Sequence, residues 1–212
     1  MSKLVPAGLI ALALVPSVAG AARLGALASG APAPERFTEM PAPVVVHIIG
    51  ALIYSLVGAF QFEDGFRRNH RAWHRRAGRV LVVAGLAVAL SGAWMTLFSD
   101  LPPNDHPVVN IARLLVSAAM TYGLVTAVRA IRRRDIRRHR AWMIRSYALA
   151  LGAGTQAFTL APYTVAAGEP GPGPRAALMI LGWAINLAVA EWIIRRPARN
   201  RRATLSPATL RG

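Results

Sequence analysis

The chain has 212 residues, 54% of them hydrophobic, and its mean hydropathy is +0.39. This composition is typical of an integral membrane protein and excludes an ordinary soluble domain. The formal net charge is +16, but the basic residues form short blocks between apolar runs, so we expect no nucleic-acid partner. The chain has no cysteine, which excludes disulfides, iron–sulfur clusters and thiol nucleophiles.

Six apolar windows are long enough to cross a bilayer, which takes about 20 helical residues. We therefore predict an all-α fold, a polytopic bundle of about six transmembrane helices within residues 1–195. The windows are Leu4 to Ala22, Val44 to Phe62, Val80 to Phe98, Val108 to Val128, Trp142 to Tyr163, and Ala176 to Ile194. Residues 196–212 are rich in arginine and proline, which predicts a flexible basic tail.

The first window has two interpretations. Lys3, an apolar run and the small residues Ala19, Gly20 and Ala21 also resemble a cleaved secretory signal peptide. We favour a retained helix, because the run is long for a signal segment and no soluble exported domain follows it.

Arginines are concentrated in alternate connections. Six lie in residues 67–79, seven in 129–140 and six in 195–211, whereas the other connections hold only Arg23, Arg36 and Arg175. Basic loops face the cytoplasm, so we expect a protein of the bacterial inner membrane with both termini cytoplasmic. Anionic lipid headgroups are then the expected partners of the arginines.

The tetrapeptide His-Arg-Ala-Trp occurs twice, at 70–73 and at 139–142. Each copy precedes an outward-running window, which indicates that windows two and three correspond to windows four and five as a parallel duplication. We expect these four windows to form the core of the bundle, with windows one and six peripheral.

Three stretches resemble a known family: residues 74–80 (His-Arg-Arg-Ala-Gly-Arg-Val), the pair Ser91-Gly92, and residues 139–149 (His-Arg-Ala-Trp-Met-Ile-Arg-Ser-Tyr-Ala-Leu). They resemble the signature of the bacterial predicted membrane proteins grouped as domain of unknown function 2306, over about residues 44–165. The resemblance implies a polytopic membrane protein with these histidines and arginines at the cytoplasmic interface, and it implies no established activity.

Small and polar residues form a stripe on each of four predicted helices. The stripes are His47, Gly50, Tyr54, Gly58 and Gln61; Gly78, Gly85, Ala89 and Gly92; Asn110, Arg113, Ser117 and Thr121; and Arg145, Gly152, Gln156 and Thr159. We interpret them as helix–helix seams. The alternative is a lined cavity or a slot for a planar cofactor.

Three charged residues lie inside the predicted helices. Arg113 and Arg145 could extend to the headgroups, but Glu191 is too short to do so and needs a cation, for which we prefer Arg145. We interpret the Arg145–Glu191 pair as a structural clamp, and the alternative is a gate or an anion site that includes Arg113.

The histidines allow a redox interpretation. Neutral imidazole is the usual axial ligand of haem b, and His74 and His139 could form such a site on the cytoplasmic side, with His47 near the outer side. The alternative is an interfacial belt of histidine, tryptophan and arginine. No residue pattern indicates a separate metal site, and the catalytic residues, if there are any, stay unknown.

Two functions therefore stay open at the level of the sequence. One is an electron-transfer membrane protein that binds haem b or a quinone. The other is a non-redox protein, either a small transporter or an accessory subunit that interfacial arginines anchor, acting with another membrane protein or as a homo-oligomer.

Overall fold

The computed structural model describes residues 4–32, 35–100, 102 and 104–196, and the secondary structure of this part of the chain is helical throughout. The elements are α1 (Leu4–Ser29), α2 (Glu35–Thr38), α3 (Pro41–Leu52), the π-helical turn η1 (Ile53–Val57), the 3₁₀ turn η2 (Phe60–Phe62), α4 (Asp64–Asn69), α5 (Arg71–Phe98), α6 (Pro107–Arg132), α7 (Ile136–Ala150), α8 (Gly152–Ala167) and α9 (Pro172–Arg195).

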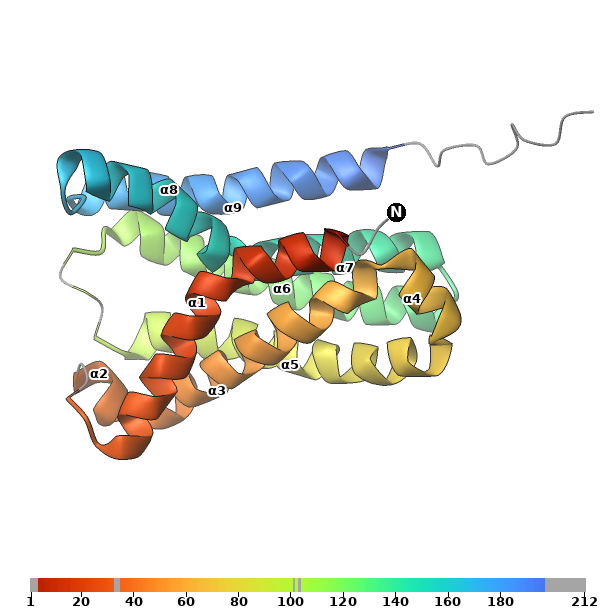
Figure 1. Ribbon diagram of the computed structural model, residues 1–212, viewed down its shortest axis with the longest axis horizontal. Helices are drawn as coiled ribbons and strands as arrows, with labels where there is room; N and C mark the ends of the chain where they lie inside the picture. The colour runs from red at the N-terminus through yellow and green to blue at the C-terminus, as the bar shows by residue number, and fades with distance from the viewer. Residues whose placement is uncertain (1–3, 33–34, 101, 103, 197–212) are drawn as a thin grey trace, which may run out of the picture.

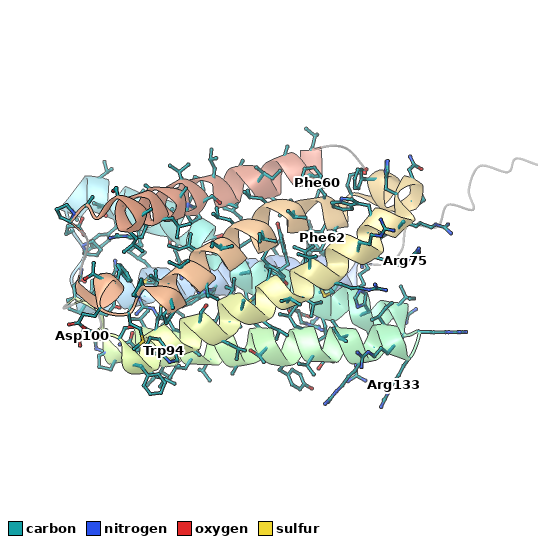
Figure 2. The ribbon with its side chains drawn as sticks, turned by 90° about the horizontal axis from the view of Figure 1, so that it is seen from below. Phe60, Phe62, Arg75, Trp94, Asp100 and Arg133 are labelled. Atoms are coloured by element: carbon teal, nitrogen blue, oxygen red, sulfur yellow. The ribbon has the colours of Figure 1, made fainter. Side chains whose placement is uncertain are left out.

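The chain runs from one end of the bundle to the other six times (Figure 1). We call one end the arginine-rich end: it contains α4, the start of α5, the α6–α7 turn and the end of α9. Figure 2 shows Arg75 and Arg133 at this end and Trp94 and Asp100 at the opposite end. The all-helical polytopic bundle predicted from the sequence is confirmed.

Five passes are continuous segments long and apolar enough to cross a membrane, among the residues that the structure describes. They are Leu4–Ser29, Pro41–Phe62, Arg71–Phe98, Pro107–Arg132 and Pro172–Arg195. Several helices extend beyond their apolar windows, and α5 begins nine residues before Val80. Helical hydrogen bonding continues past the apolar windows, because arginine is about as compatible with a helix as the apolar residues are.

The fifth predicted window is broken into two helices. α7 ends at Ala150 and α8 begins at Gly152. A β-carbon at Gly152 would lie 2.1 Å from Nε1 of Trp183, and one at Gly154 would lie 2.1 Å from the backbone oxygen of Leu12. Two glycines in three residues weaken the helix and let the chain bend against α9 and α1.

The second pass contains a π-helical turn. Regular α-helix stops at Leu52, and the turn that follows holds Tyr54, whose side chain is 1% exposed. The hydroxyl of Tyr147 in α7 donates a hydrogen bond to the backbone oxygen of Ser55 at 2.5 Å. The turn is therefore fixed by a neighbouring helix as well as by its own backbone.

The core lies between α3 with η1, α5, α6 and α7. Its largest fully buried side chains include Tyr54, Leu81 and Leu124. In α1 and α9, 11% and 17% of the apolar window are buried, compared with 28% in the passes of α3, α5 and α6. The first and last passes are therefore peripheral, and the exposed leucines and valines of the bundle form a surface suited to lipid.

Several members of the small and polar stripes lie at helix–helix contacts. A β-carbon at Gly50 in α3 would lie 3.1 Å from the backbone oxygen of Ala84 in α5. In α8 the Gln156 amide donates to the Met179 oxygen of α9 at 2.9 Å. Close backbone approach and interhelical hydrogen bonds of this kind hold membrane helices together.

Candidate histidine site at the arginine-rich end

His139 lies in the first turns of α7, which begins after Asp135, whose side chain accepts a hydrogen bond from the Arg138 backbone at 2.9 Å. Its Nδ1 is 3.0 Å from the backbone oxygen of Ala127 in α6. A carbonyl can only accept, so Nδ1 carries the proton and donates. In the neutral imidazole this leaves the lone pair on Nε2, as in histidines that ligate a metal through Nε2.

His74 lies one turn into α5, on the helix face that continues through Gly78 and buried Leu81. Its Nδ1 is buried and has no hydrogen-bond partner among the described residues. His139 is one of the groups that act electrostatically on the His74 ring, after Arg67. A β-carbon at Gly78 would meet no atom within 4 Å, so there is space one turn away from His74.

His47 belongs to a different place, in the half of the bundle that faces the opposite end. Its Nδ1 is 3.1 Å from both the Val88 backbone oxygen and the Ser91 hydroxyl of α5. Nδ1 must donate to the carbonyl, so its Nε2 also keeps a lone pair. The ring packs against Gly92, whose added β-carbon would lie 3.4 Å from His47 Cε1. The structure thus brings His74 and His139 to one end and separates His47 from them.

Three further polar atoms are buried in the described part of the bundle. Like His74 Nδ1, the Tyr54 hydroxyl, Gln61 Nε2 and the Ser146 hydroxyl are buried without a partner in the described residues. The sequence analysis included Tyr54 and Gln61 in a polar stripe but missed Ser146. Its position seven residues after His139, two turns along the same face of α7, is the signal that would have found it.

Arg145 and Glu191 form a two-pronged ion pair between α7 and α9. Arg145 Nε donates to Glu191 Oε1 at 2.5 Å, and Nη2 donates to Oε2 at 3.1 Å. The two side chains are 27% and 31% exposed. Arg195 lies 3.5 Å from the same carboxylate, and the Arg145 guanidinium stacks over the Trp142 ring at 4.9 Å. The pair links the core to the peripheral last helix.

Arg113 lies in the first turns of α6, at the end opposite the arginine-rich end. It donates to Asp105 in the α5–α6 loop and to Asn110 at 2.7 Å. Arg175, at the start of α9, donates to the other Asp105 oxygen at 3.1 Å. Burial opposes ionisation of Asp105, but the hydrogen bonds and charges of the two arginines outweigh it, so the pKa of this carboxyl is lowered. This clamp was missed because its central residue lies in a loop.

The described residues contain no cluster of three or more histidine, aspartate or glutamate side chains that could hold a metal ion. The most pronounced hollows in this part of the chain are open surface grooves, one between α5 and α6 and one beside the end of α9. The histidine pair consists of two imidazoles near positively charged side chains, which include Arg75. In its neutral form, His139 has Nε2 available as a ligand.

The all-helical architecture and its five apolar spans define a polytopic membrane protein of the α-helical class. A family model described as predicted membrane protein (DUF2306) matches residues 44–194, and the chain belongs to this family. The match extends past the stretch recognised from the motifs and includes α9, the helix of Glu191. A search of the curated proteins finds no match, and a search of the solved structures finds none either.

Proposed function

We propose that this protein transfers electrons in the bacterial inner membrane and binds a haem b between His74 and His139. The observation that carries the proposal is the placement of two imidazoles from α5 and α7 at the same end of the core, with the His139 tautomer fixed by the Ala127 oxygen. Haem b, when bound, takes up and releases one electron at its iron.

The residues around the pair fit this group. The hydrogen bond from Nδ1 of His139 orients the ring and increases the basicity of Nε2, as the second-shell bonds of ligating histidines do. Open space at Gly78 leaves room beside His74, and the positive charge of Arg75 suits the carboxylates of a haem. A quinone would use the same imidazoles as hydrogen-bond partners, and the experiment below distinguishes the two.

An absorption spectrum of the purified full chain, expressed with haem available, tests the proposal. We expect Soret and α bands that shift on dithionite reduction. The bands should be lost in His74→Ala and His139→Ala and kept in the control His70→Ala, because His70 lies at the same end but its Nδ1 and its ring are engaged by Phe66. A protein without these bands refutes haem binding, and quinone in an organic extract of the same preparation would then support the alternative cofactor.

The proposed orientation places the arginine-rich end in the cytoplasm, together with both termini. It is supported by the exposed arginines of the α6–α7 turn, because basic connections stay on the cytoplasmic side. Reporter fusions after Arg140 and Arg202 should give cytoplasmic signals, and a fusion after Asp105 should give a periplasmic signal. A periplasmic signal at Arg202 would contradict the orientation.

The second candidate is a non-redox accessory subunit or small transporter. It is favoured by the Arg145–Glu191 clamp, whose geometry serves structure without any cofactor. This candidate predicts a colourless protein whose thermal stability falls by no more than the loss of the His139–Ala127 hydrogen bond when both histidines are replaced. The haem proposal predicts that the same double variant loses both colour and stability, because a bound cofactor stabilises the folded state.

A further inference from the structure

Two buried hydroxyls in the core have no protein partner in the described part of the chain. The side chains of Tyr54 and Ser146 are each 1% exposed, and neither oxygen forms a hydrogen bond there. Between membrane helices an unpaired polar group is costly, because neither lipid nor an apolar core can satisfy it. We therefore expect each of these hydroxyls to have a hydrogen-bond partner, and their positions indicate which kind of partner it is.

Ser146 differs from four other hydroxyls of these helices. Serine and threonine inside a membrane helix normally bond to the carbonyl four residues earlier. Four side chains here do so: Ser55, Ser91, Thr96 and Thr121. Ser146 makes no such bond with Trp142 and instead lies against α6, where its oxygen is 2.5 Å from the position of a β-carbon on Gly123. The hydroxyl is turned away from its own helix and into the core.

Tyr54, like Ser146, packs closely against a glycine of a neighbouring helix. Its Cε2 is 2.7 Å from the position of a β-carbon on Gly85 in α5, so only glycine leaves room for the ring. The Tyr54 and Tyr147 rings are 5.7 Å apart, and Ser146 is the neighbour of Tyr147 in α7. The Tyr54 ring therefore packs against the residue that follows Ser146 in α7.

Two more unpaired atoms continue towards the arginine-rich end. Gln61 follows the π-helical turn and precedes Phe62, whose ring is 4.7 Å from that of Tyr147, and its Nε2 is buried without a partner in the described residues. His74 Nδ1, at the start of α5, is the fourth. The series runs from the end of the bundle at His74 to the middle of the second pass at Tyr54.

We propose that bound water molecules bridge these four side chains and form a hydrogen-bonded path from the arginine-rich face to Tyr54. Water is the occupant that fits, because the set mixes hydroxyls, an amide and an imidazole, and water can both donate and accept. The two open surface grooves beside α9 and between α5 and α6 are lined by other side chains than these four. The path can carry protons into the core, and it does not require a haem.

Radiolytic labelling tests the path directly. A short X-ray pulse on the full chain in lipid nanodiscs makes hydroxyl radicals from bound water, and mass spectrometry locates the modified side chains. We expect Tyr54 to be oxidised despite its burial and to take up ¹⁸O from labelled water. Met120, which is 2% exposed in the same bundle, is the internal control and should stay unmodified. Labelling of Tyr54 no greater than that of Leu124, which is 0% exposed, would overturn the proposal.

Thermal stability gives a second test. The change in melting temperature on removing a hydroxyl has opposite signs for a site that contains water and one that does not. Removing a hydroxyl that water bridges lowers the melting temperature, whereas removing one that is unpaired in a dry core raises it. We therefore expect Tyr54→Phe to lower the melting temperature. Tyr147→Phe is the matched control, because it loses the bond to Ser55 and is destabilised in either case. A rise for Tyr54→Phe would overturn the proposal, and neither readout depends on bound haem.

Discussion

Replacing either member of the Arg145–Glu191 pair with leucine is expected to destabilise the protein, and replacing both is expected to restore part of the loss. Each single change leaves the partner charge uncompensated between α7 and α9, where two hydrogen bonds of 2.5 and 3.1 Å now satisfy it. The double change removes both charges together with the cost of desolvating them.

The exposure of the pair determines the magnitude. Breaking a fully buried pair costs about 3–5 kcal/mol, whereas exposed pairs contribute about 0.2–1 kcal/mol. The side chains of Arg145 and Glu191 are 27% and 31% exposed, which is between these cases. We therefore expect a loss of about 2 kcal/mol for each single variant. In a chain of this length that corresponds to a fall in Tm of about 4–8 °C.

Thermal unfolding in detergent, followed by tryptophan fluorescence, measures the three variants as a double-mutant cycle. Arg195→Leu is the matched control, because Arg195 approaches the same carboxylate at 3.5 Å but is 79% exposed, and its loss should cost less than about 1 kcal/mol. Coupling of at least about 1 kcal/mol between Arg145 and Glu191 supports the reasoning. Additive losses would refute it and would leave Arg145 as an interfacial anchor.

Two further predictions concern the other end of the molecule and the break in the fifth pass. Because the pKa of Asp105 is lowered in the folded state, its stabilising effect is complete above the unfolded pKa of about 4 and is lost as the pH falls through the folded value. Asp105→Asn should therefore lower the melting temperature at pH 7, and this difference should shrink in acid; a difference that grows in acid would contradict the assignment. Gly154→Ala should cost about 1–3 kcal/mol, because its β-carbon would lie 2.1 Å from the Leu12 backbone oxygen. Gly78→Ala, with nothing within 4 Å, should be neutral or slightly stabilising in the same thermal assay, and equal losses for the two variants would show that packing is not the cause.

The position of a residue between the two ends of the bundle could be predicted from the sequence. The length of each apolar window and the arginine blocks between windows indicate which residues lie at which end, since each helical residue advances the chain by about 1.5 Å. For this reason the sequence analysis placed His74 and His139 at one end, His47 towards the other, and Arg145 at the same depth as Glu191. In the structure His74 and His139 lie at the arginine-rich end, and Arg145 contacts Glu191.

Lateral relations depended on the tertiary structure. The bend between α7 and α8, the contacts of the π-helical turn at Tyr54, and the direction of the Ser146 hydroxyl are all decided by side chains of other helices. Arg113 shows the same limit of sequence reasoning, because its partner Asp105 lies in a loop that no helical periodicity places. A hydropathy pattern indicates where a residue lies along the axis of the bundle. Which neighbour it meets depends on the rotation and spacing of the helices, which only the packing of distant segments against each other determines.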